Sequence, residues 1–215
     1  MPHDNGAAPN PFGGTCTLAI CKPVIRRTAK VEDWVVGTGS AHFGFENKVI
    51  YAMKITETLT MREYDKRCNQ NLKIKIPDFR NAKSYRDRVG DCIYDFSTDP
   101  PVMRMGVHNE GNRQRDLDGL NVLLSKHFYY FGENALELPE YLRNIIRKGQ
   151  GHRSTSNAQY FELFVTWIES KTEARNKILS EPMGRESFTR DKDHLSKCAA
   201  IDNQQDELDE KTPCD

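Results

Sequence analysis

The chain lacks the features that mark several whole classes of protein. Its 215 residues contain no apolar run near the roughly 20 residues that a membrane-spanning helix needs. Residues 1–14 are rich in Pro, Gly and Asn and have no apolar segment typical of a signal peptide. The sequence therefore predicts a cytoplasmic protein with no membrane partner.

Close cysteine pairs and a net charge are missing as well. The six cysteines include no CxxC pair, so no zinc site is predicted and the thiols are expected to stay reduced. Basic and acidic side chains balance at 31 each, with a net charge of zero. Any attraction to nucleic acid must therefore come from a local patch and not from the whole molecule.

Familiar catalytic motifs are also absent. The chain has no GxSxG, no HExxH, no HxE followed by PCxxC, and no dinucleotide-binding glycine run. No nucleophile and base stand at a diagnostic spacing. These absences argue against a familiar hydrolase, deaminase or oxidoreductase and indicate no cofactor and no metal, but they leave an unfamiliar enzyme open.

The elements that are present predict an α+β fold. Strands are expected over 15–21, 33–37, 48–57, 92–96, 102–106 and 122–131, and helices over 23–29, 61–68, 139–148 and 157–171. Thr60 followed by Glu63 fits a capping box, and 108–119 is interpreted as a polar loop. Because strands dominate the first two thirds, we expect a small, strongly curved mixed sheet or barrel with helices packed outside.

Composition divides the chain into three parts. Residues 1–14 are interpreted as a flexible lead, residues 15–179 as one folded domain, and residues 180–215 as a disordered polar tail. From Asp202 onward the tail has six acidic residues and one lysine. Few apolar side chains remain there to offset the entropy of ordering.

Two basic turns are candidate phosphate sites. Arg26 and Arg27 follow a strand, and the planar fork of arginine matches a phosphate with two parallel hydrogen bonds. The turn at 149–154 precedes a predicted helix start, where free N–H groups favour an anion, and it carries the donors His152, Arg153 and Ser154. A solvated helix face and an ordinary capped loop would explain the same two segments without a ligand.

Two other segments suit a flat base. Trp34 precedes the turn that contains Gly39 and Ser40, so an aromatic ring and small residues could line a pocket. In GDCIY, Asp91 could accept hydrogen bonds from a base edge and Tyr94 could stack. An ordinary turn, a turn cap and a core tyrosine are the simpler interpretations.

Four segments occur together in an order and spacing that point to one family. They are TLAICKPVIRRTAKVEDWVVGTGS (17–40), VIYAMKITE (49–57), GDCIY (90–94) and GHRS (151–154). In these segments the chain resembles the nucleotide-modification-associated domain family, type two, over about residues 15–171. The order of strands and turns is also similar to that of PUA-like domains, which bind modified bases. Glu32 and Cys92 depart from the family pattern, where Gly and Asn are expected.

The resemblance implies a link to systems that modify DNA bases or nucleotides. It favours a protein that binds a nucleotide or modified base through Arg26, Arg27, Trp34, Gly39, Ser40, Asp91, Tyr94, Arg153 and Ser154. One alternative is an enzyme acting on such a ligand with His152 as general acid and base. Another is an interaction domain whose basic loop, 69–88, meets an acidic partner. Proteins of DNA modification are the expected partners, and whether a reaction is catalysed stays open.

Overall fold

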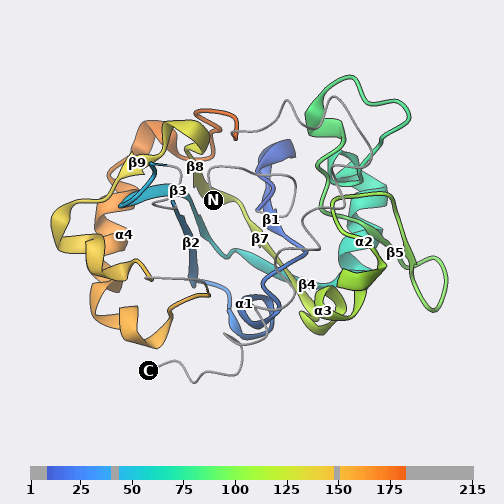
Figure 1. Cartoon of the computed structure of the whole chain (residues 1–215), viewed down its shortest axis with the longest axis horizontal. Helices are drawn as coiled ribbons and strands as arrows, with labels where there is room; N and C mark the ends of the chain where they lie inside the picture. Colours follow the sequence, from blue (N-terminus) through green and yellow to red (C-terminus); the bar gives the residue numbers. More distant parts are fainter. Residues whose placement is uncertain (1–8, 40–43, 148–150, 183–215) are drawn as a thin grey trace.

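The computed structural model describes residues 9–39, 44–147 and 151–182 (Figure 1). The strands are β1 (Cys16–Leu18), β2 (Trp34–Thr38), β3 (Lys48–Lys54), β4 (Glu57–Thr60), β5 (Tyr94–Asp95), β6 (Val102–Met103), β7 (Asn121–Ser125), β8 (His127–Tyr130) and β9 (Leu136–Glu137). The α-helices are α1 (Pro23–Thr28), α2 (Met61–Asn71), α3 (Arg113–Asp118) and α4 (Phe161–Glu169). In Figure 1, α2 and α4 lie on opposite sides of the strands.

Two chain segments bend from one sheet into the next. One sheet has the order β1-β7-β4, and a second has the order β2-β3-β8 with β9 paired to β3. The segment β3–β4 changes sheet at Thr56, and the segment β7–β8 changes sheet at Lys126. The Thr56 N–H donates to the Leu124 carbonyl at 2.9 Å, and the Lys126 N–H donates to the Thr56 hydroxyl at 3.0 Å. These bonds hold the bend in both segments.

The α+β class is confirmed, but the barrel is not. The described strands form several small sheets, none of which closes into a barrel, and each named strand pair is antiparallel and not mixed. At Thr56 and Lys126 the chain leaves one sheet and enters the other. The strands therefore do not curve around to close a single barrel. A PUA-like arrangement is not confirmed.

Local sequence rules explain part of the helical structure. The Thr60 hydroxyl accepts from the Glu63 N–H at 3.2 Å, and the Glu63 carboxylate accepts from the Thr60 N–H at 2.8 Å, which confirms the capping box at the start of α2. The predicted helix at 139–148 is instead a 3-10 helix, η7 (Glu140–Ile145). The predicted helix at 157–171 is η8 (Thr155–Tyr160) followed by α4.

The interpretation of 108–119 as a loop is wrong. A short 3-10 helix, η5 (Glu110–Asn112), begins this segment, and α3 completes it. The Asn109 side chain accepts from the Gly111 N–H at 2.9 Å and caps the start of η5. Six mostly polar residues give α3 no apolar stripe, so its sequence does not reveal it.

The folded domain begins before residue 15. Asn10 and Phe12 are buried, and Asn10 pairs with Thr17 through two backbone hydrogen bonds. Lys75 is also buried, and its ammonium donates to the carbonyl oxygens of Asn10 and Thr15 at 2.7 Å each. Residues 9–12 therefore belong to the core, while the predicted tail from 183 onward lies outside the described residues.

No helix in the described ranges is long and apolar enough to span a membrane.

Candidate active site

Cys21 lies at a sharp turn between a strand and a helix. β1 ends at Leu18, the buried residues Ala19 and Ile20 follow, and α1 begins at Pro23. Cys21 and its neighbour Lys22 have φ values of 58° and 43°, a left-handed conformation that residues with a side chain rarely adopt. Such a strained turn from strand to helix is a known way to present a nucleophile to solvent. The Cys21 thiol is free and half-buried.

A histidine contacts the sulfur of Cys21, and an aspartate contacts that histidine. His108 Nε2 lies 3.2 Å from Cys21 Sγ, and His108 Nδ1 lies 2.5 Å from Asp116 Oδ2. The side chains of His108 and Asp116 are almost completely buried, at 5% and 1% exposed. With a carboxylate at Nδ1, that nitrogen carries a proton, so Nε2 is the atom that exchanges a proton with the sulfur. We call Cys21, His108 and Asp116 the thiol site.

Asp116 is held by two further donors. The Cys21 N–H donates to Asp116 Oδ1 at 2.9 Å, and the Tyr94 hydroxyl donates to Asp116 Oδ2 at 2.9 Å. Burial raises the pKa of Tyr94, and the negative charge of Asp116 raises it further, so Tyr94 remains a donor. The carboxylate thus binds the nucleophile turn, the histidine and a tyrosine at once.

The surroundings favour a charged histidine. Burial alone would lower the pKa of His108, but the hydrogen bonds to Asp116 and Cys21 and the charges of both groups raise this pKa to about 10. At neutral pH the imidazole therefore carries protons on both nitrogens. His108 Nε2 can therefore donate a hydrogen bond to Cys21 Sγ and exchange that proton with it, and the thiolate is the nucleophilic form of cysteine.

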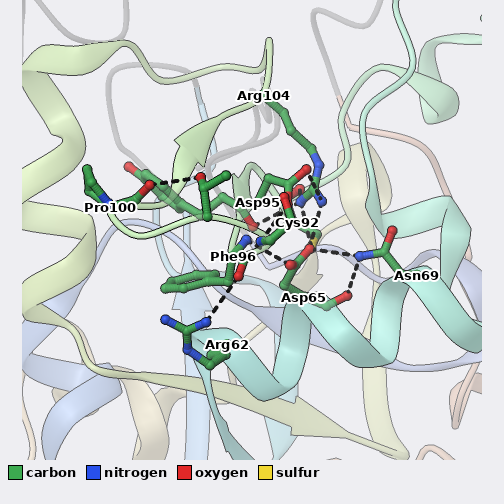
Figure 2. A network of polar contacts seen from close by, with 11 residues as sticks. Arg62, Asp65, Asn69, Cys92, Asp95, Phe96, Pro100 and Arg104 are labelled. Carbon is green, nitrogen blue, oxygen red and sulfur yellow. Dashed lines mark hydrogen bonds and ion pairs between the residues drawn. The ribbon is translucent and has the colours of Figure 1, made fainter.

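A separate polar network fixes the hairpin that carries Tyr94 (Figure 2). Arg104, next to β6, donates to Asp65 Oδ1 of α2 at 2.7 Å and to the Tyr94 carbonyl at 2.9 Å. The Phe96 N–H donates to Asp65 Oδ2 at 2.9 Å. Asp65 and Arg104 thereby hold the β5–β6 hairpin on α2, with Tyr94 at its start and His108 shortly after its end.

The arrangement can perform nucleophilic catalysis. It contains a thiol on a half-buried residue, an imidazole within hydrogen-bond reach of the sulfur, and a carboxylate that orients the imidazole. The described part of the chain contains no group of three or more His, Cys, Asp or Glu side chains arranged to hold a metal ion.

Comparison with models of protein families identifies the family of the chain. A family model described as nucleotide modification associated domain 2 matches residues 1–189. The chain belongs to this family. No curated protein and no solved structure matches it. The nucleotide modification associated domain 2 family thus links the chain to nucleotide modification, and the thiol site lies within the matched residues.

Three of the predicted ligand residues of this family member are buried and hydrogen-bonded within the protein. They are Arg26, Asp91 and Tyr94. Asp91 accepts from the hydroxyls of Thr17 and Tyr64 at 2.7 and 2.6 Å. The Arg26 guanidinium donates to four backbone carbonyl oxygens of the protein. Their placement does not favour the predicted contacts with phosphate or a base edge, because those polar atoms already have partners.

Trp34 is part of an aromatic cluster. Its ring stacks on Tyr129 at 6.2 Å between centroids and meets His127 and Phe164 edge-on at 5.2 and 6.1 Å. The ring is half-buried between β8 and α4. Stacking of Trp34 on a base stays a prediction.

The other predicted residues lie outside the thiol site. Gly39 donates its N–H to Lys48 across the β2–β3 pair, and Ser40 lies outside the described residues. Arg153 donates to the Asn144 carbonyl at 2.7 Å, which ties the turn at 151–154 to η7. The roles of His152, Arg153 and Ser154 stay predictions, and none of the described hydrogen bonds places them at Cys21.

Arg27 is an exposed predicted ligand residue on one of the helices that carry the thiol site. It lies on the exposed side of α1 and donates to the Asp118 carbonyl at the end of α3 at 3.0 Å. α1 follows the Cys21 turn directly, and α3 carries Asp116, so the hydrogen bond of Arg27 connects the two helices that flank the site. Its guanidinium remains partly exposed.

Proposed function

We propose that the chain is a thiol-dependent enzyme of nucleotide modification, with Cys21 as its nucleophile. The observation that carries this proposal is the continuous contact from Cys21 Sγ through His108 to Asp116, with distances of 3.2 and 2.5 Å. The family supplies the association with nucleotide modification. The nucleotide or modified base remains the ligand, and the proposed chemistry lies at Cys21 instead of His152.

The proposed reaction is acyl transfer at a carbonyl carbon of the modified nucleotide. The Cys21 thiolate forms a C–S bond to that carbon, and the leaving group departs with the proton that His108 Nε2 donates. A water molecule then gives its proton to Nε2 and attacks the thioester, which breaks the C–S bond and regenerates the thiolate. Asp116 keeps the proton on Nδ1 and stabilises the imidazolium throughout.

Arg27 is the residue that we propose for substrate phosphate. It belongs to the helix that follows the nucleophile, and one of its N–H groups is committed to Asp118. The remaining donors of its fork suit a phosphate oxygen. Arg27→Ala is expected to weaken binding of a phosphorylated substrate more than that of the corresponding nucleoside.

The test is turnover of acylated nucleotides by the full-length protein. Nucleoside monophosphates acylated on the exocyclic amine, and DNA oligomers with the same bases, are incubated and analysed by mass spectrometry. We expect deacylated product and an acyl mass on Cys21, and product formation should fall at least about 100-fold in Cys21→Ser. The matched control is Cys16→Ala, a change at a buried thiol of β1.

Two results would count against the enzyme. Unchanged turnover in Cys21→Ser would remove the nucleophile from the proposal. Saturable binding of a nucleotide with neither product nor adduct at Cys21 would favour the alternative, a nucleotide-binding protein without turnover.

A further inference from the structure

Arg26 is the largest fully buried side chain of the domain, although it is a cation. Its guanidinium donates to four backbone carbonyl oxygens: Nε to Cys21 at 2.8 Å, Nη1 to Ala19 at 2.8 Å and to Asn121 at 3.0 Å, and Nη2 to Asp116 at 2.5 Å. These carbonyls belong to the nucleophile turn, to α3 and to the start of β7. One side chain therefore bonds the backbone of both Cys21 and Asp116.

The surrounding backbone fits the arginine closely. A Cβ on Gly119 would lie 2.1 Å from Arg26 Nη2, so any other residue at 119 would displace the guanidinium. The Asn121 amide in turn donates to the Arg26 carbonyl at 3.3 Å. A lysine at this position has three donors on one nitrogen and cannot span carbonyls that a planar fork reaches from different sides.

We propose that Arg26 is the positioning residue of the thiol site, holding the nucleophile turn and helix α3, which carries Asp116, at a fixed separation. This inference rests on the proposed function. Arg26 acts through the backbone of Cys21 and Asp116 and does not touch substrate. Its role is to keep Cys21 Sγ within hydrogen-bond reach of His108, which Asp116 orients. Since a shift of about 1 Å in catalytic geometry can cost about 100-fold in rate, this restraint matters for reactivity.

The experiment compares Arg26→Lys with Arg143→Lys in the full-length protein. The second substitution is a matched control, because Arg143 is an exposed arginine of η7 that pairs with Glu137 and has no role in the thiol site. The rate of Cys21 alkylation by iodoacetamide is measured by peptide mass spectrometry, well below the melting temperature of each variant. His108→Asn, alone and combined with Arg26→Lys, reports the part of the rate that depends on the histidine.

We expect Arg26→Lys to slow alkylation of Cys21 by about tenfold or more, to about the rate of His108→Asn, with little further loss in the double variant. Arg143→Lys should match the wild type. Gly119→Ala is the second variant, since it displaces the guanidinium without removing it, and it should slow alkylation in the same way if Arg26→Lys does not fold.

The outcomes distinguish a failure of the inference on Arg26 from a failure of the proposed function. If His108→Asn slows alkylation but Arg26→Lys and Gly119→Ala do not, Arg26 is not a positioning residue, although the thiol site stands. If His108→Asn leaves the rate unchanged, the proposed function fails and the inference on Arg26 fails with it. A purely structural role for Arg26 would lower the melting temperature but leave the dependence of alkylation on His108 intact.

Discussion

At the scale of single residues, His108 decides the electrostatics of the site. It is buried against Asp116, yet the hydrogen bonds and charges of Asp116 and Cys21 outweigh the effect of burial and raise its pKa to about 10. A histidine held in its charged form stabilises the folded state whenever the unfolded chain would bind fewer protons. The stability of the protein should therefore depend on pH through this residue.

The first prediction is a pH dependence that His108→Asn removes. Because the folded pKa is raised above the ordinary 6.5, the stabilisation is complete below about pH 6.5 and is lost as pH rises to about 10. Thermal unfolding measured from pH 6 to 10 should show that the melting temperature of the wild type exceeds that of the variant at low pH and that this difference disappears across the window. His127→Asn, at a half-buried histidine of β8, is the control. A difference in melting temperature that does not change with pH would contradict the account.

Lys75 shows how a basic residue in a polar loop can belong to the core. Burial lowers the pKa of its ammonium, while the negative charge of Asp91 opposes that shift. The ammonium donates to two atoms of Asn10 and to the Thr15 carbonyl at 2.7–3.0 Å. This residue of the basic loop is therefore not available to the acidic partner that the sequence allowed.

The second prediction concerns this buried lysine. Lys75→Ala removes three hydrogen bonds that the buried ammonium donates to Asn10 and Thr15, and it should lower the free energy of unfolding by about 3 kcal/mol in chemical denaturation. Lys73→Ala, at an exposed position two residues earlier, should change it by no more than about 0.5 kcal/mol. Equal effects of the two substitutions would show that Lys75 is not held as described.

At the scale of elements, the β5–β6 hairpin is the part whose position depends most on side chains. Each strand has two residues, so few backbone bonds hold the pair, and Asp65 and Arg104 attach it to α2 (Figure 2). This pair is largely buried, at 7% and 16% exposed, so removal of one partner leaves a charge with poor hydration.

The third prediction tests that attachment. Asp65→Ala removes the more deeply buried of the two carboxylates that pair with Arg104 and the acceptor of the Phe96 N–H, and it should destabilise the fold by about 3 kcal/mol. Glu57→Ala breaks the pair with Arg67, whose side chains are 37% and 35% exposed, and should cost only about 0–1 kcal/mol. Urea unfolding of both variants measures the difference in the free energy of unfolding. Similar losses in the two variants would show that the pair of Asp65 and Arg104 contributes no more than a surface ion pair.

Elements also differ in how far their sequence predicts them. The capping box at Thr60 lies within four residues, so local sequence was sufficient to place the start of α2. The bends at Thr56 and Lys126 depend on a hydrogen bond between segments 70 residues apart, which no local pattern records. α3 is short and polar, and it became helical where the sequence indicated a loop.

At the scale of the whole molecule, the thiol site could not be predicted because folding assembles it. Cys21 and His108 are 87 residues apart, and Asp116 follows His108 within a segment interpreted as a loop. The one local signal was a cysteine directly after a strand and two residues before the proline of a helix. The family was predicted correctly from longer segments, and the segment 17–40 that carried the resemblance contains Cys21.

The most direct test of the central claim is the rate at which iodoacetamide alkylates Cys21 at pH 6, in the wild type and in His108→Asn. Asparagine keeps a donor toward Asp116 but leaves no group opposite the sulfur. We predict rapid alkylation of Cys21 in the wild type, while the buried Cys16, Cys68 and Cys92 stay unmodified, and a rate at least about tenfold lower in the variant. Equal rates in the two proteins would contradict the account, since His108 would then have no influence on the thiol.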